Sequence, residues 1–287
     1  RAIDSTDDKT FIHFDFKENF KYDWENNIKV TSRHFSLINV DIPKECRTDF
    51  IKKCNGSEYD LTSQGCCNEE IFEKKSHICQ NERLLRFCDG TPYDTASAVC
   101  RFGKVIKYGF IKDKRDGRQY KTVKIDGQIW MAENLNYKTN DSYCFKDDES
   151  NCDVYGRLYK YGAAQNACPS GFHLPSKEDY NKLKEKAISY AGSKKDAHKI
   201  LKSTSWEDSI HPDNSGIDAF GFGLFPAGSK HPLGHYNLDT RGGGNTMLWT
   251  SSQMGKDASY FFNVDFSSAF IDHNGNNFAY SVRCIKN

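Results

Sequence analysis

The first 45 residues alternate aromatic and charged side chains, a pattern typical of β-strands. In Phe14-Asp15-Phe16, and again from Phe20 to Trp24, the rings would lie on one face of a strand and the charges on the other. We therefore predict that residues 1–45 form a β-strand-rich segment, either an antiparallel sheet or a ribbon that completes another sheet. Core packing of the rings is favoured over a ligand platform.

A 13-residue pattern then occurs three times, at 54–66, 67–79 and 88–100. A cysteine opens each copy, an aromatic residue stands sixth, an acidic residue seventh, and a second cysteine closes it. Each copy is too short to bury a core, so disulfides must stabilise it, with a loop of this size contributing about 3 kcal/mol. We predict a disulfide-rich repeat segment over 46–112, a stapled spacer rather than a ligand-binding module. Pairing within each copy is the simplest of the possible connectivities. It would join the first and last cysteines of the copies: Cys54 and Cys66, Cys67 and Cys79, Cys88 and Cys100.

The hydrophobic pattern changes after residue 112, and we place a larger domain at 113–287. Alternating residues on both sides of Asp126-Gly127 predict a hairpin, because this dipeptide readily takes the positive φ angles of a tight turn. Two helices are expected next, one over 155–167 and one capped by Ser176. The sequence that follows is typical of strands, in the runs 247–252, 258–266 and 278–284.

Composition points to an exported protein. Eleven cysteines are unusual for a cytosolic chain, and no Cys-x-x-Cys pair is present for zinc. Disulfides are therefore expected, with one thiol free or paired outside the chain, which is Cys46 if the copies pair internally. Basic and acidic residues number 40 and 39, so no basic footprint for nucleic acid is present. No apolar run approaches the ~20 residues of a membrane span, and we expect a mature extracellular or outer-surface chain whose signal peptide has been removed.

Several separated motifs within 113–287 occur in an order that resembles the Fibrobacter succinogenes major paralogous domain family. They lie at 116–136, 155–159, 168–176, 218–222, 248–252 and 281–284. The resemblance implies a bacterial cell-surface protein of the α+β class. Its domain would be C-type-lectin-like, with two helices, twisted antiparallel strands and a long loop region, and related to the formylglycine-generating-enzyme group. It also implies two disulfides, Cys144–Cys152 and Cys168–Cys284.

Acidic residues in and beside the Cys144–Cys152 loop form a candidate structural calcium site: Asp147, Asp148, Glu149 and Asp153. Carboxylate oxygens are the ligands that Ca²⁺ prefers, although a solvated acidic turn has the same composition. The Glu-Pro-Asn or Gln-Pro-Asp triplets of calcium-dependent lectins are absent from the sequence. Calcium is thus expected in a structural role, if at all, and no other cofactor is expected.

Catalytic motifs are also missing. The sequence contains no Gly-x-Ser-x-Gly, no His-Glu-x-x-His and no phosphate-binding loop. The formylglycine-generating relatives use redox-active cysteines late in the domain, where this chain offers only Cys284, which the resemblance assigns to a structural disulfide. We expect a protein that binds and does not catalyse.

A Gly-rich stretch that carries aromatic residues, Asn214 to Asn245, is long enough to suggest function. Three glycines follow Arg241 and contribute no side chains to packing, so this backbone either approaches a ligand or forms a flexible connection. The candidate ligand-binding residues in and beside it are Tyr236, Arg241, Asn245 and Trp249. The expected ligand is a glycan or another surface protein. The alternative is a structural component of a surface complex or filament, joined through the amino-terminal strands or the odd cysteine.

Overall fold

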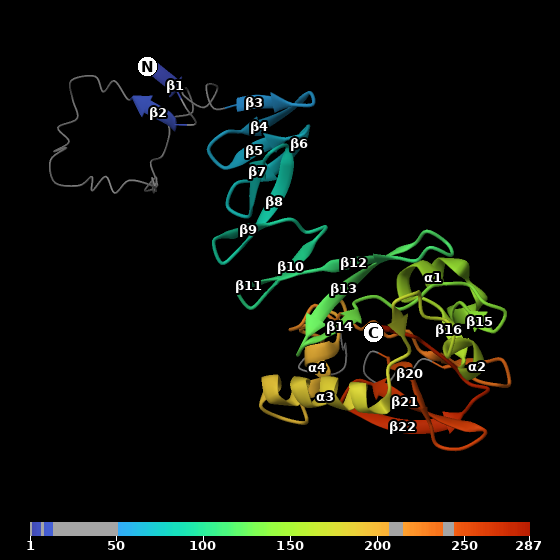
Figure 1. Ribbon diagram of the computed structural model, residues 1–287. Coiled ribbons are helices and arrows are strands. Elements are labelled where there is room, and N and C mark those ends of the chain that lie inside the picture. Colours follow the sequence, from blue (N-terminus) through green and yellow to red (C-terminus); the bar gives the residue numbers. More distant parts are fainter. Residues whose placement is uncertain (1, 7–8, 14–50, 207–214, 238–243) are drawn as a thin grey trace. The chain divides into compact units, whose positions relative to one another are not determined.

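The structure is a computed structural model of residues 1–287 and describes all of them except 1, 7–8, 14–50, 207–214 and 238–243 (Figure 1). It divides into two compact units, 1–51 and 52–287. In the first unit, strands β1 (Ala2–Thr6) and β2 (Lys9–His13) pair as an antiparallel hairpin. The remaining strands expected in 1–45, and Cys46, lie outside the described residues.

The repeats form a succession of short β-hairpins that can be followed in Figure 1. The strands are β3 (Ile51–Cys54), β4 (Ser57–Asp60), β5 (Gln64–Cys67), β6 (Glu70–Glu73), β7 (His77–Gln80), β8 (Arg83–Cys88), β9 (Thr91–Tyr93), β10 (Ala98–Arg101) and β11 (Lys104–Lys107). Five two-residue turns close them, and both residues of each turn have positive φ, as in Asn55 at 48° and Gly56 at 80°. Such turns match the right-handed twist of the strands that they connect, so local backbone chemistry builds each hairpin.

Disulfide bonds cross-link these hairpins. They are Cys54–Cys66, Cys67–Cys79 and Cys88–Cys100, each spanning 12 positions, which confirms pairing within each copy. The buried hydrophobic residues of the segment are chiefly three of these cysteines, Cys54, Cys67 and Cys88, with Ala98. Covalent links therefore replace the apolar core that segments of this size cannot build.

The strands in the rest of the second unit form three small sheets. The first has the order β12 (Gly109–Lys112), β13 (Gln119–Ile125), β14 (Gln128–Met131), β24 (Ile285–Lys286) and β17 (Phe172–His173). The second has the order β15 (Ser142–Tyr143), β16 (Leu158–Lys160), β23 (Ala279–Tyr280), β18 (Ser229–Lys230) and β19 (Tyr236–Asn237). The third has the order β20 (Thr246–Gln253), β21 (Ala258–Val264) and β22 (Ala269–Gly275). The hairpin predicted at Asp126-Gly127 is confirmed as β13–β14, and β12, which precedes residue 113, pairs with β13.

The helices are α1 (Glu149–Tyr155), α2 (Tyr161–Ala164), α3 (Lys177–Ala191) and α4 (Ala197–Leu201), with a 3₁₀ turn at Phe145–Asp147. The helix predicted after Ser176 is confirmed as α3, with a capping box in which Ser176 and Asp179 exchange hydrogen bonds. The helix predicted over 155–167 is wrong. Gly156 ends α1 at a φ of 73°, and residues 158–160 pair as a strand before the single turn of α2.

The α+β, C-type-lectin-like fold expected from the resemblance is also wrong. Strands make up 41% and helices 15% of the described residues, and α3, with 15 residues, is the one long helix among them, packed against the five-residue α4 and small sheets. It packs against the sheet β20-β21-β22 (Figure 1). In this interface the rings of Tyr180 and Phe262 stack at 5.0 Å. Of the helices described, none is long and apolar enough to cross a lipid bilayer.

Two further disulfides lie in this part, Cys144–Cys152 and Cys168–Cys284, as the resemblance implied. The second joins positions 116 residues apart, and its Cys284 is fully buried in the core. Together the five disulfides pair ten of the chain's eleven cysteines. This degree of oxidation is consistent with an extracellular or secreted protein.

Candidate functional site

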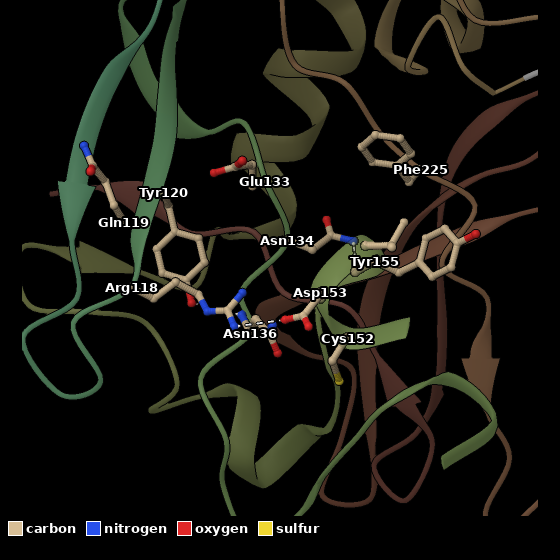
Figure 2. A pocket seen from close by; sticks show the side chains of 12 residues that line it. Arg118, Gln119, Tyr120, Glu133, Asn134, Asn136, Cys152, Asp153, Tyr155 and Phe225 are labelled. Carbon is tan, nitrogen blue, oxygen red and sulfur yellow. Dashed lines mark hydrogen bonds and ion pairs between the residues drawn. The ribbon is translucent and has the colours of Figure 1, made fainter. Parts of the chain in front are cut away.

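A polar pocket of about 130 Å³ lies between strand β13, the loop after β14 and the end of helix α1 (Figure 2). Its lining combines charged, amide and aromatic side chains with a few small ones: Arg118, Gln119, Tyr120, Glu133, Asn134, Asn136, Cys152, Asp153, Val154, Tyr155, Gly156 and Phe225. These residues come from four separate stretches of the sequence, so only the fold brings them together.

The floor of the pocket is held rigidly by Asn134. Its Nδ2 donates to the Tyr155 carbonyl at 2.8 Å, and its Oδ1 accepts from Arg283 Nε at 2.8 Å. Gly156 closes the floor, because a Cβ there would stand 2.7 Å from the Asn134 Cβ. Arg283 is fully buried, and burial lowers the pKa of its guanidinium to about 10, so the group still carries its charge at neutral pH. Asn134 therefore positions the pocket and has its hydrogen bonds already made.

The rim offers groups that a ligand can reach. Arg118 Nη2 and Asp153 Oδ1 form an ion pair at 3.1 Å, drawn as a dashed line in Figure 2, and both side chains are exposed. Glu133 accepts the Lys121 N–H at 2.7 Å through one oxygen. Within the described part of the chain its other oxygen accepts no hydrogen bond. The rim thus presents a donor fork and carboxylate acceptors side by side.

Tyr120 separates the rim from the core. Its hydroxyl accepts the Asn136 N–H at 3.1 Å, and burial raises its pKa to about 12, so it stays protonated at neutral pH. Two other rings, Tyr155 and Phe225, line the pocket while only half-buried, which leaves ring surface for a ligand. Cys152 is oxidised in its bond to Cys144 and offers no thiol nucleophile. The arrangement suits reversible binding of a neutral, hydroxyl-rich molecule.

The four carboxylates of the expected calcium site do not converge. Asp148 caps α1 by accepting from the Ser150 N–H at 2.9 Å, and Asp153 pairs with Arg118. Glu149 binds Arg157 at 2.5 Å and Lys138 at 3.3 Å, and the two cysteines beside it, Cys144 and Cys152, are joined in a disulfide and cannot ligate a metal. Each carboxylate is thus bound to a cation or a backbone amide of its own instead of sharing one point with the others. These residues therefore do not fit Ca²⁺.

Asp147, the fourth carboxylate, belongs to another cluster. Its Oδ1 accepts from the Tyr236 hydroxyl at 2.5 Å and from Lys230 Nζ at 3.0 Å. The hydrogen bond from Tyr236, followed by that from Lys230, holds the pKa of Asp147 below its usual value. The Tyr236 ring also meets Phe145 edge to face at 5.3 Å. Tyr236, a predicted ligand-binding residue, is therefore held by its hydroxyl and by an edge-to-face contact of its ring.

Two other predicted ligand-binding residues are interior. Trp249 is fully buried, and its indole N–H donates to the Tyr159 carbonyl at 2.7 Å. Asn245 is 7% exposed, with its carbonyl accepting the Gly228 N–H at 2.9 Å. Their assignment to an exposed ligand face is corrected, because core packing already uses them. Arg241 lies outside the described residues.

Sequence analysis missed the pocket even though it singled out two of the segments that form it. The motifs at 116–136 and 155–159 contain most of the lining residues, including Asn136 and Tyr155. The signal was the gathering of amide, acid and aromatic residues within those motifs. The sequence could not show that the two motifs lie close together in space, because about twenty residues separate them along the chain.

Comparison with known proteins supports the resemblance. Residues 123–286 match the family model described as the Fibrobacter succinogenes major domain. No curated protein and no solved structure matches the chain significantly.

Proposed function

The chain belongs to the Fibrobacter succinogenes major domain family, and from the pocket in Figure 2 we propose that it is a non-catalytic extracellular protein that binds a glycan. The observation that carries the proposal is the set of Arg118, Asp153 and Glu133 beside half-exposed rings. A sugar hydroxyl both donates and accepts a hydrogen bond, so a guanidinium next to carboxylates meets both needs.

Aromatic surface supplies the second half of the proposal. The apolar face of a sugar ring stacks on aromatic side chains, for which Tyr155 and Phe225 are available at the edge of the pocket. With a volume of about 130 Å³, the pocket takes the edge of one sugar unit and leaves the rest of the glycan outside. This geometry suits a unit within a longer chain.

The disulfides are the basis for proposing that the protein is extracellular and that it is not a catalyst. Five of them favour an oxidising compartment, where a surface or secreted protein meets polysaccharides. They include the cysteine in the pocket, which removes the thiol as a nucleophile. Because the carboxylates of 147–153 do not converge, glycan binding is expected to be independent of calcium.

The test is a glycan array with the full chain, with and without a calcium chelator, followed by titration calorimetry with the best neutral glycan. Changing Arg118 and Asp153 together to Ala is expected to weaken that binding about tenfold or more. The melting temperature should hardly change, because exposed ion pairs contribute little to stability. The matched control is the Lys160–Asp141 pair, an exposed ion pair at 3.0 Å outside the pocket, also changed to Ala. Absence of any bound glycan, or equal affinity of the two double variants, would overturn the proposal.

A further inference from the structure

A second cavity, of about 240 Å³, lies where the hairpin β10–β11 meets strand β13 and helix α3. We call it the hairpin groove. Its lining is basic and aromatic: Arg101, Lys104, Ile106, Lys124, Ile125, Asp126, Lys186, Tyr190, Ala219 and Phe220. Among the described residues, none lines both this groove and the polar pocket of Figure 2.

Charge in the hairpin groove is strongly one-sided. Four cationic side chains face one carboxylate, Asp126, although the whole chain carries a net charge of only +1. Asp126 is paired with Lys186 at 3.3 Å, and Arg101 is paired with Asp218 at 2.8 Å. Among the residues that the structure describes, Lys104 and Lys124 have no acidic partner within 4.0 Å. Two ammonium groups are therefore left for an anion.

Aromatic surface stands beside these lysines. Tyr190 is 50% exposed and contacts Phe220 edge to face at 5.3 Å. Phe102, in the turn of the same hairpin, is 62% exposed, and its ring centroid lies 6.4 Å from that of Tyr190. The two rings are tilted by 50° to each other, so together they offer a ring face and a ring edge against which the apolar face of a sugar can pack.

The turn that carries Phe102 breaks the pattern of the other hairpins. In the other four two-residue turns the first residue is asparagine or aspartate, which tolerates a positive φ: Asn55, Asn68, Asn81 and Asp89. Phe102 adopts the same left-handed backbone at a φ of 49°, which is costly for a bulky residue. Phe102 is held there at a conformational cost, and its contact with Tyr190 still leaves it 62% exposed, so ring surface remains for a further contact.

From the lysines, the rings and the strained turn we infer that the hairpin groove binds a uronate unit of an acidic polysaccharide. The sugar ring packs against Tyr190, which lines the groove, and against Phe102 beside it, and its carboxylate accepts from Lys104 and Lys124. The groove is smaller than the roughly 300–1,000 Å³ of sites for drug-sized ligands, which suits one such unit. This is a second site, independent of the neutral-glycan pocket.

The experiment titrates the full chain with oligogalacturonate and, as a neutral probe with the same backbone, with its fully methyl-esterified form. The acidic form is expected to bind about tenfold or more tightly, and the difference should shrink as salt screens the lysines. Equal binding of the two probes, or no binding of the acidic one, would overturn the inference.

Two variants locate the site. Phe102→Asn gives this turn the residue found in three of the others, so it should keep or raise the melting temperature while weakening oligogalacturonate binding about fivefold or more. Changing Lys104 and Lys124 to Ala should abolish the preference for the acidic probe. The matched control changes Lys75 and Lys114, two exposed lysines outside the groove, and should retain that preference. Unchanged affinity in Phe102→Asn would place the ligand elsewhere.

The two sites can be told apart. The Arg118/Asp153 double variant of the first pocket should bind oligogalacturonate like the parent chain. Loss of acidic binding in that variant would mean that the uronate occupies the first pocket and would overturn the inference for the hairpin groove, whatever the outcome with neutral glycans.

Discussion

Arg101 of the third repeat donates from Nη2 to the Asp218 carboxylate at 2.8 Å and from Nε to its carbonyl at 3.1 Å, across 117 residues of sequence. The Asp218 side chain is 4% exposed. Burial raises the pKa of that carboxyl, and the hydrogen bond and charge of Arg101 oppose the rise without cancelling it. Ile106 and Tyr108, after the same turn, pack against the main core. The last hairpin is thus attached to the rest of the second unit by an ion pair and by apolar contacts.

Replacing Arg101 with Gln is expected to lower the free energy of unfolding by about 1–3 kcal/mol, because a buried carboxylate loses its charged partner. Urea denaturation measures the change. Arg83→Gln, at an exposed arginine of β8, is the control and should cost less than about 0.5 kcal/mol. In combination with Asp218→Asn the effects should be less than additive. Full additivity would show that the two side chains do not interact.

The long disulfide is expected to stabilise the protein more than the short one. Removing Cys168–Cys284, which spans 116 positions, should cost about 5 kcal/mol, against about 2–3 kcal/mol for Cys144–Cys152, which spans 8. The reason is that the longer closed loop restricts the unfolded chain more. Calorimetric melting of the two double-alanine variants makes the comparison. A lower melting temperature for the short-loop variant would contradict the loop-entropy argument.

Gly156→Ala should damage the floor of the polar pocket. A Cβ at this position would lie 2.9 Å from the Leu135 carbonyl oxygen, in a backbone with a φ of 73°. Gly192→Ala is the matched control, since Gly192 has a φ of 70° and nothing within 4 Å of the added carbon. The control should lose about 1–2 kcal/mol for the left-handed backbone, and Gly156→Ala about 1–3 kcal/mol more for the overlap. Equal losses in denaturant titrations would mean that the loop moves without cost.

His198 is expected to make the protein acid-sensitive. It is 1% exposed in α4, and burial, followed by the charge of Lys202, lowers its pKa from 6.5 to about 4. Between these values the unfolded chain binds a proton that the folded chain does not. Stability is therefore complete above about pH 6.5 and falls as the pH drops toward 4, by up to about 3 kcal/mol through this group.

Denaturation across that pH range tests the histidine against His198→Leu, which keeps an apolar side chain of similar size and cannot titrate. The variant should lose less stability than the parent chain between pH 6.5 and 4. Parallel pH profiles would assign the acid sensitivity to other groups.

Features set by neighbouring residues could be predicted from the sequence alone. Three features depend on backbone preferences and loop lengths of a few residues: the hairpin at Asp126-Gly127, the cap of α3 at Ser176 and the pairing within the repeats. Such elements are stabilised by interactions between neighbouring residues, so a short stretch of sequence is enough to predict them. Local patterns also failed where one residue interrupted them, as Gly156 did in the helix expected over 155–167.

The candidate sites depended on tertiary structure. Packing decided that Trp249 lies in the core and that Asp147, Asp148, Glu149 and Asp153 bind separate partners. It also brought Arg118 to Asp153, and the turn of Phe102 to Tyr190 of α3. Residue types determine what each side chain can bind. Only the closing of long loops determines which side chains face the same cavity, because that closure depends on contacts summed over the whole core.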